Sequence, residues 1–363
     1  MNALKPTTLA GLVEAVRGVE RLRVEGGRTK PGLLRGDGAV LSLGFLRGVV
    51  EYDPGEFTFT ALSGTPVAEV AAMLGERGQH LPFDPMLLDA GSTLGGMVAS
   101  GLSGPGRLRH GGVRDFILGA RMVDGLGRLL RMGGKVVKNA AGFDVPKFMV
   151  GSHGRHGVLG EVTFKVFPRP AARMTLRLRA PGIREAVGIL LEAARSRFDF
   201  EALDVWPGSR DVMARLAGPP EALGPMAIEV LSRWPGECMD GGEAGTRWAG
   251  LRELGWVRGG MSVARVPCTP GHVAGLLDHV ADMHLMSAAN VALVSFEPGA
   301  VRGRLEKWMK TQGLRGMLLR GDGRMWLGAS CPMGVEEAVR RALDPLGRFG
   351  GPGDPDEGHD GNE

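Results

Sequence analysis

Apolar residues recur along this chain at two periods, one typical of helices and one typical of strands. After Thr8, apolar side chains at positions 9, 12, 13, 16 and 19 keep helical spacing, so a threonine-capped helix is expected there. Residues 21–25 alternate as strands do and run directly into Gly26 and Gly27. A further helix is expected over 66–75, because proline is favoured in the first turn of a helix. By the same criteria, strands are expected over 116–123, 129–132, 160–166, 173–179, 227–232, 261–266 and 291–296, and helices over 184–195, 272–283, 302–311 and 335–343.

This mixture of strands and helices predicts an α+β fold with two domains. Every tryptophan lies after residue 200, most glycine-dense segments lie before 170, and prolines on both sides of Arg169 favour an extended connector. We therefore expect a first domain over 1–170, a smaller α+β cap domain over 171–345, and a C-terminal return with a disordered tail over 346–363. The tryptophans of the cap either fill its core or form a docking surface, since both uses are common.

Composition narrows the class of protein. With 363 residues, 43% hydrophobic and 23% charged, the chain is typical of a soluble globular protein. Three cysteines are too few for a disulfide framework and favour a reducing, cytoplasmic location. No signal peptide and no 18-residue apolar run is evident, so we expect no membrane span. The net charge of +4 comes without a basic run interleaved with aromatics, so we expect no nucleic-acid partner.

Glycine departs from the usual composition, and its placement suggests a site for an anion. The chain has 60 glycines, well above the usual share of about 7%, clustered in motifs without a fixed period. The first cluster follows the predicted strand over 21–25. Its backbone N–H groups, a hydroxyl and a cation would all suit phosphate oxygens. The residues of this loop are Gly26, Gly27, Arg28, Thr29 and Lys30.

A second glycine loop precedes a predicted helix. Ser92 or Thr93 can cap that helix and direct its first N–H groups at an anion. Two glycines in the first turn cost about 1 kcal/mol each relative to alanine, which is reasonable if a ligand must approach there. The alternative is a glycine-rich face for helix packing. The loop consists of Gly91, Ser92, Thr93, Leu94, Gly95 and Gly96.

Four ordered segments carry a resemblance to a known family. They read LPFDP from Leu81, AGSTLGGMVASGLSGPGR from Ala90, HGGVRDFILGARMVDGLG from His110 and KNAAGFDVPKFMVGSHGRHGVLGEVTFKV from Lys138. Together they resemble the PCMH-type (vanillyl-alcohol-oxidase-type) FAD-binding family, and within it the FAD-binding subunits of bacterial glycolate oxidases. The resemblance implies a two-subdomain FAD-binding domain followed by a cap. The chain departs from the family at Arg28, where a third glycine is usual, and at Arg155-His156, where Thr-Leu is usual.

The resemblance also implies further FAD-binding residues. They are Ser100, Gly101, Gly112, Arg114, Asp115, Lys138, Asn139, Gly142, Asp144, Gly157 and Val158. No histidine stands at the family's site of covalent flavin attachment, so we expect FAD to be bound non-covalently. His110, His153 and His156 lie inside the motifs and are candidates for contacts with the flavin ring edge.

Catalytic residues cannot be assigned from the sequence. Catalytic relatives carry a histidine-containing H-x-G-D-G-N-x-H stretch in the cap, and the nearest match here, Leu319–Trp326, has other residues at both histidine positions. His272, His279 and His284 straddle one predicted helix at spacings of 7 and 5, which do not suit a shared ligand face. No metal site is expected, so any iron–sulfur relay would belong to another polypeptide.

The sequence is compatible with three functions. The first is an FAD-binding subunit of a complex that oxidises glycolate or another small 2-hydroxy acid. The resemblance implies a larger catalytic flavoprotein and an iron–sulfur protein as its partners, with possible peripheral attachment to the inner membrane through them. The second is a stand-alone FAD oxidoreductase acting on another hydroxy acid or alcohol. The third is an assembly subunit that keeps the flavin fold without turnover.

Overall fold

The computed structural model describes residues 3–34, 38–134, 144–330 and 334–349, which form two compact units. The first unit comprises Met1–Leu102, Gly112–Pro168 and Cys331–Glu363, and the second comprises Ser103–Gly111 and Arg169–Ser330. One transition falls between Pro168 and Arg169, beside the expected boundary at 170. The second unit ends at Ser330 rather than 345 and takes a short segment from the middle of the first. A linear pattern cannot show such a discontinuous unit, because membership depends on contacts between distant residues.

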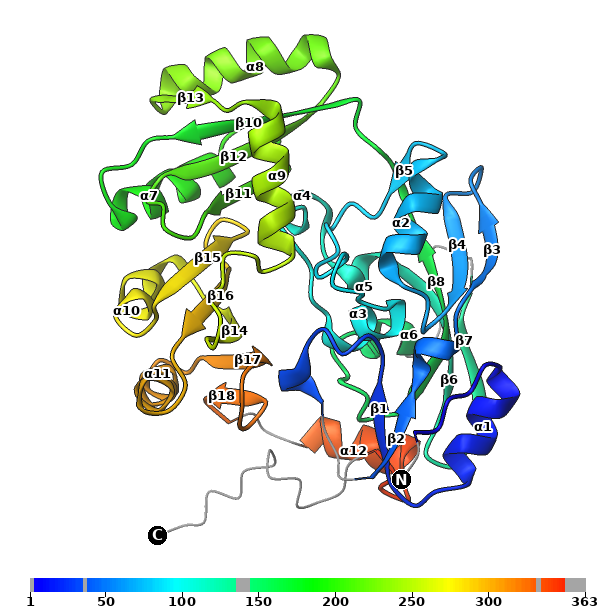
Figure 1. Ribbon diagram of the computed structural model, residues 1–363. Coiled ribbons are helices and arrows are strands. Elements are labelled where there is room, and N and C mark those ends of the chain that lie inside the picture. The colour runs from blue at the N-terminus through cyan, green and yellow to red at the C-terminus, as the bar shows by residue number, and fades with distance from the viewer. Residues whose placement is uncertain (1–2, 35–37, 135–143, 331–333, 350–363) are drawn as a thin grey trace. The chain divides into compact units, whose positions relative to one another are not determined.

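The first unit contains a five-stranded antiparallel sheet and a separate two-stranded parallel pair (Figure 1). The five-stranded sheet has the order β3-β4-β8-β6-β7, and β1 pairs with β2. Its helices are α1 (Leu9–Arg17), α2 (Val67–Gly75), α3 (Leu94–Ser100), α5 (Val113–Phe116), α6 (Val145–Phe148) and α12 (Gly334–Leu343), with 3-10 turns at Pro31–Leu33 and Leu43–Phe45. Its strands are β1 (Leu22–Glu25), β2 (Ala39–Ser42), β3 (Val49–Asp53), β4 (Thr58–Leu62), β5 (Gln79–His80), β6 (Ile117–Val123), β7 (Leu129–Gly133), β8 (Val158–Lys165) and β9 (Phe167–Pro168).

Two hydrophobic clusters stabilise the first unit. One joins the five-stranded sheet to the apolar faces of α2 and α3, with Phe59 and Phe164 stacked at 5.8 Å between ring centroids. The other gathers α1, β1 and β2 around Leu12, Val16 and Leu41, all fully buried. Thr8 caps α1 by accepting a hydrogen bond from the Gly11 N–H at 3.1 Å, as the sequence predicts. The site described below lies beside β1 and α3, one element from each cluster.

The C-terminal residues return to the first unit and fix β1. The buried Asp344 carboxylate accepts hydrogen bonds from the N–H groups of Arg348 and Phe349, both at 2.9 Å. The Leu22 N–H of β1 in turn donates to the Arg348 carbonyl at 2.8 Å. A Cβ at Gly125 would lie 2.1 Å from Asp344 Oδ1, so the close approach of this segment explains that glycine. The expected tail over 350–363 lies outside the described residues.

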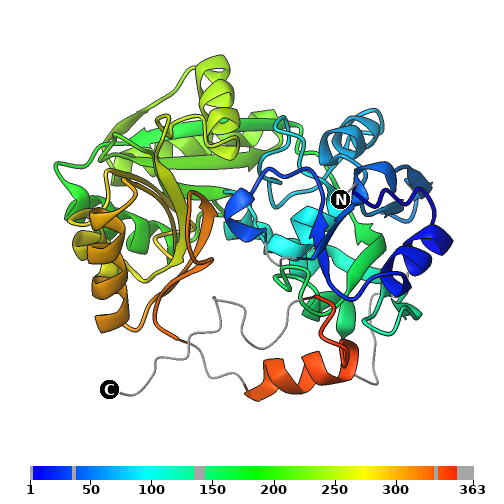
Figure 2. The same ribbon diagram turned by 60° about the horizontal axis from the view of Figure 1, so that its bottom comes forward.

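The second unit is built on one nine-stranded sheet with the order β13-β10-β12-β11-β15-β16-β14-β17-β18. Figure 2 shows its strands interspersed with helices as the colour runs from green to orange. Its strands are β10 (Ala172–Leu178), β11 (Ala202–Val205), β12 (Val212–Gly218), β13 (Gly236–Cys238), β14 (Ser262–Pro267), β15 (Asp282–Met286), β16 (Val291–Phe296), β17 (Arg315–Arg320) and β18 (Trp326–Gly328). Its helices are α4 (Arg107–His110), α7 (Ile183–Ala194), α8 (Pro220–Arg233), α9 (Gly241–Arg252), α10 (Val273–Leu277) and α11 (Ala300–Thr311), with a 3-10 turn at Pro270–His272.

Helices cover the two faces of this sheet unequally. The main cluster packs α7, α8, α10 and α11 on one face, and a smaller cluster packs α9 on the other. Within the smaller cluster the Trp206 and Trp248 rings meet edge to face at 5.0 Å. Three of the six tryptophans are buried, and Trp256, Trp308 and Trp326 are half-buried. The structure therefore favours the core-filling alternative for these side chains over an exposed docking surface.

Two expected elements are wrong, and the tertiary contacts give the reasons. Residues 227–232 belong to helix α8, because Leu223, Ala227 and Val230 recur at helical spacing and face the core together. Residues 272–283 form only the short α10 before the chain enters β15, which pairs with β16. His284 therefore lies on a strand and is fully buried, outside the helix expected over 272–283.

No helix within the described ranges combines the length and apolar character that a membrane crossing requires.

Candidate flavin site

The two glycine loops predicted from the sequence lie directly against each other. A Cβ at Gly26 would lie 2.4 Å from Thr93 Oγ1, and one at Gly27 would lie 1.9 Å from the Gly91 carbonyl oxygen. Both distances are far below contact, so any side chain at these positions would separate the loops. The contact between loops thus explains these two glycines and brings the first loop to the start of α3.

The first loop offers a run of unused backbone donors. No hydrogen bond within the described residues uses the N–H groups of residues 26–30. Arg28 has a left-handed backbone with φ of 54°. Consecutive N–H groups around a left-handed residue form the backbone concavity that binds anions. The loop can therefore accept an anion without giving up any bond of its own.

Arg28 is tethered by an ion pair. Its guanidinium donates to Glu25 at 2.5 Å, and Arg23 donates to the other oxygen of the same carboxylate at 2.9 Å. Only 2% of Glu25 is exposed, so this carboxylate is held between two arginines at the end of β1. The hydrogen bond from Arg28 to Glu25 also raises the pKa of Arg28 above its ordinary value. The ion pair explains how a non-glycine residue can hold the conformation for which the family uses glycine.

This tether can be tested by comparing two substitutions at position 28. Both Arg28→Gly and Arg28→Ala remove the ion pair, but only glycine adopts a positive φ without strain. We expect Arg28→Ala to have the lower thermal midpoint, by roughly 2–4 °C, the shift produced by about 1 kcal/mol in a domain of this size. Calorimetry of the two variants makes the comparison. Equal midpoints would show that residue 28 does not keep the left-handed conformation.

Lys30 places a buried cation in the same loop. It is 8% exposed, and its Nζ donates to Thr29 Oγ1 at 3.0 Å and to Ser92 Oγ at 3.1 Å. No carboxylate pairs with Lys30 within the described part of the chain. Burial lowers the pKa of Lys30 to about 8, because the charged form has lost water. A cation in this setting is stabilised by any anion that reaches its third donor.

The second loop does not supply the donors that we expected from it. Thr93 does cap α3, accepting from the Gly96 N–H at 3.3 Å. However, the Leu94 N–H donates to the Thr65 carbonyl and the Gly95 N–H to the Ser63 carbonyl at 2.7 Å. The expectation of free helix N-terminal groups is therefore wrong, because neighbouring backbone already uses them. A Cβ at Gly95 would lie 2.9 Å from Ser63 Cβ, so this glycine serves the same close packing.

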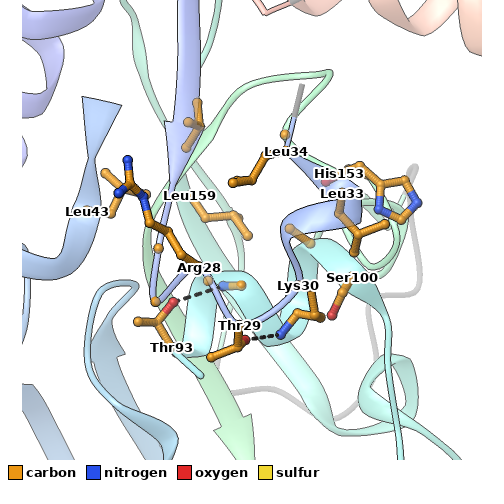
Figure 3. Close-up of a pocket in the computed structure, with 18 of the residues that line it drawn as sticks. Arg28, Thr29, Lys30, Leu33, Leu34, Leu43, Thr93, Ser100, His153 and Leu159 are labelled. Carbon is orange, nitrogen blue, oxygen red and sulfur yellow. Dashed lines mark hydrogen bonds between the residues drawn. The ribbon is translucent and has the colours of Figure 1, made fainter. Parts of the chain in front are cut away.

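An open pocket joins these features (Figure 3). Lys30, Thr29 and Ser100 lie on one side of it, and Leu33, Leu34, Leu43 and Leu159 supply apolar walls. Ser152 also lines it, and its buried Oγ has no hydrogen-bond partner in the described residues. Helix α3 presents Gly96 and Ala99 to the pocket, the two residues of the helix that are not fully buried. The full lining comprises Val24, Gly26, Gly27, Arg28, Thr29, Lys30, Leu33, Leu34, Leu43, Thr93, Gly95, Gly96, Ala99, Ser100, Ser152, His153, Gly154, Gly157 and Leu159.

The other predicted site residues divide into three groups. Gly157 lines the pocket, whereas the Val158 side chain is buried in the cluster around α1. Gly101, Gly112, Arg114, Asp115 and Asp144 do not line it. Asp115 and Asp144 instead accept hydrogen bonds from the Gly112 N–H at 2.8 Å and the Lys147 N–H at 3.2 Å, as local helix caps. Lys138, Asn139 and Gly142 lie outside the described residues.

Of the histidines inside the motifs, His153 lines the pocket with a left-handed backbone, φ 51°. His156 is buried and packs against the Phe148 ring at 5.1 Å. The sequence reading missed the leucines of the walls. They lie in or directly after 3-10 turns and on β8 without a periodic signal, so only the fold brings them together.

The segment that matched the catalytic stretch of relatives is the turn of the β17–β18 hairpin. Gly321 and Gly323 have φ of 116° and 103°, and Arg302 donates to the carbonyls of Asp322 and Arg324. A Cβ at Gly323 would lie 2.5 Å from the Arg302 guanidinium. These glycines are therefore explained by the hairpin and its contact with α11.

The pocket residues fit FAD. The diphosphate of FAD needs unused N–H donors and a cation, which residues 26–30 supply, and its rings need apolar walls. The orphaned Ser152 hydroxyl offers a further hydrogen bond to a bound ligand. No covalent attachment is required by this arrangement.

Comparison with known proteins also supports FAD as the cofactor. Residues 3–133 match the family model of the FAD binding domain, which confirms the expected resemblance. The chain is 44% identical over 180 residues to "Glycolate oxidase subunit GlcE" of Escherichia coli (strain K12), covering 49% of this chain and 51% of that protein. It is 31% identical over 139 residues to "Glycolate oxidase subunit GlcD" of Bacillus subtilis (strain 168), covering 38% and 29%. The chain thus spans about half the length of the first relative and less of the second.

Among solved structures, an alkyldihydroxyacetonephosphate synthase superposes with a TM-score of 0.71 and 17% identity. The match covers 94% of this chain and 74% of that one. It confirms the expected α+β fold class, and at this identity it speaks for the fold alone.

Proposed function

We propose that this chain is a non-covalent FAD-binding subunit of an oxidoreductase that acts on a small 2-hydroxy acid such as glycolate. The FAD assignment rests on Lys30. This buried cation bonds to hydroxyl groups within the described residues, and it lies beside the unused backbone N–H groups of the same loop. It lies inside the segment that matches the FAD binding domain family. The substrate class is supported by the names of the two relatives described above.

Each part of the pocket has a role in this proposal. The N–H groups of residues 26–30 and Lys30 would hold the diphosphate, and Ser100 and Ser152 would donate or accept along the remaining chain of the cofactor. Gly96 and Ala99 leave room for it on α3, and the leucine walls exclude water. Bound FAD would supply the two-electron acceptor for the oxidation. Some of the remaining predicted residues stay candidates for contacts with FAD outside this pocket. They are Arg114, Asp144, Lys138, Asn139 and Gly142.

The proposal also includes partner subunits. Both relatives are named as subunits, which favours a multi-subunit assembly. We propose a larger flavoprotein and an iron–sulfur protein as partners, which would carry electrons from the flavin to a membrane acceptor.

The experiment measures flavin content and its reduction separately. The purified chain should contain FAD or take it up on reconstitution, with flavin absorbance near one equivalent. Anaerobic glycolate or D-lactate should reduce the flavin rapidly only when the partner subunits are present. A chain that takes up no flavin would contradict the cofactor assignment. Rapid bleaching by the chain alone would support a stand-alone enzyme instead.

A further inference from the structure

Arg265 occupies an unusual position in the second unit. It lies in the middle of β14, between Ala264 and Val266, which pack into the main cluster beneath α10 and α11. Because side chains alternate along a strand, Arg265 points to the opposite face of the nine-stranded sheet. Strand pairing sets Arg265 opposite Leu293 on β16 and opposite Met317 on β17. A half-buried guanidinium therefore lies on an interior strand of the sheet rather than on an edge strand.

The Arg265 guanidinium has no acceptor among the described residues, neither a hydrogen bond nor an ion pair. Burial and, to a lesser extent, the positive charge of Arg107 on α4 together lower the pKa of Arg265 to about 10. Among the described residues, Cys268 is its favourable electrostatic neighbour, but burial raises the pKa of that thiol to about 12. The thiol is therefore neutral near pH 7 and gives Arg265 no counter-charge.

Arg107, like Arg265, has a half-buried guanidinium without an acceptor in the described residues. It lies in the segment 103–111 of the same unit. Its neighbour Arg109, by contrast, pairs with Asp199 at 2.5 Å. Two cations close enough to repel each other, neither paired, are unfavourable unless something negative lies between them.

One buried acidic side chain on this face, Asp204, is already used. Leu293, which pairs with Arg265, also pairs with His284 on β15. The His284 Nε2 lies 2.8 Å from Asp204 Oδ2, and the Ser287 N–H donates to Asp204 Oδ1 at 3.1 Å. Both oxygens of this buried carboxylate are therefore engaged, and no carboxylate of the described residues pairs with Arg265 or Arg107.

We propose that Arg265 and Arg107 form a binding site for the carboxylate of a small organic acid. Guanidinium groups match a planar carboxylate with paired N–H donors, which a half-buried setting strengthens. The site deepens the proposed function, because it would recognise the acid group of a 2-hydroxy acid. Its binding step can nevertheless be measured without any turnover.

The test uses oxalate as the probe, because oxalate has two carboxylates and no C–H bond to lose as hydride. Calorimetric titration of the purified holoprotein should show oxalate binding that weakens at least tenfold in Arg265→Gln and in Arg107→Gln. Arg304→Gln, at an exposed position on α11, is the matched control and should bind as the wild type does. Inorganic phosphate is the second probe and should bind more weakly than oxalate.

Stability separates a ligand-binding arginine from a structural one. Without oxalate, Arg265→Gln should have a thermal midpoint equal to or above that of the wild type, because an uncompensated buried charge is removed. Arg265→Lys should retain part of the oxalate affinity. A lowered midpoint with unchanged oxalate affinity would overturn the proposal, and so would tighter binding of phosphate than of oxalate. If oxalate binds as expected but glycolate never reduces the flavin, the proposed function fails and this site stands.

Discussion

Replacing Lys30 with methionine should weaken FAD binding by about 10- to 100-fold, the value of one hydrogen bond from a charged donor to a buried anion. Methionine keeps the length of the side chain and its packing, so the loop should keep its conformation. Fluorescence titration of the FAD-free protein with FAD measures the loss. A Lys30→Met protein that binds FAD as tightly as the wild type would contradict the role assigned to this cation.

The same substitution should leave the FAD-free protein at least as stable as the wild type. The pKa of Lys30 is lowered from 10.5 to about 8 in the folded state, so the folded protein binds this proton less tightly than the unfolded chain does. At pH 7 this difference costs the folded state about 3 kcal/mol, and the cost disappears as the pH rises from 8 towards 10.5. Methionine removes the cost at every pH, which urea unfolding at pH 7 should show.

The pH dependence of FAD affinity should follow from the same group. An anionic ligand favours charged Lys30, so affinity should be full below pH 8 and should fall above it, by at most about tenfold per pH unit. Lys30→Arg is the control, because arginine stays charged and its affinity should be flat from pH 7 to 10. A wild-type affinity that is also flat over this range would show that Lys30 does not titrate at the site.

Replacing Asp344 with alanine should destabilise the first unit by about 3 kcal/mol. The substitution leaves the N–H groups of Arg348 and Phe349 without an acceptor, and hydrogen bonds to a charged group contribute about 1.5–3 kcal/mol each. Because the Arg348 carbonyl accepts from Leu22, the loss should reach β1 and the loop that follows it. Hydrogen exchange at the Leu22 amide, together with urea unfolding, measures both effects.

Two controls make this result specific. Leu346→Ala alters a side chain of the same segment that is 58% exposed and should change stability by less than about 0.5 kcal/mol. Asp344→Asn keeps one acceptor oxygen and should fall between the wild type and alanine. If Asp344→Ala unfolds like the wild type, the C-terminal return is not what fixes β1.

Much of the local structure could be predicted from the sequence. The cap of α1 by Thr8, the strand before Gly26 and the start of α3 at Thr93 all follow from short-range patterns, in which a side chain bonds to backbone a few residues away. The loop with Lys30 was found for a similar reason, because glycines, a hydroxyl and a cation stand next to one another in the chain. Residues 227–232 differ from the predicted strand because six residues are too few to separate a strand from a helix whose buried stripe begins at Leu223.

The sequence by itself determined the α+β class, the FAD-type motifs and the loop that contains Lys30. Only the tertiary structure decided the role of those glycines. Gly26 and Gly27 allow the second loop to approach closely, and the first N–H groups of the helix after that loop donate to the carbonyls of Ser63 and Thr65. The tertiary structure also brought the leucine walls to the pocket, the C-terminal segment to β1, and Arg107 towards Arg265 across more than 150 residues of chain. The physical reason is that backbone propensity and capping act over a few residues, whereas burial and charge depend on which distant segments the fold places in contact.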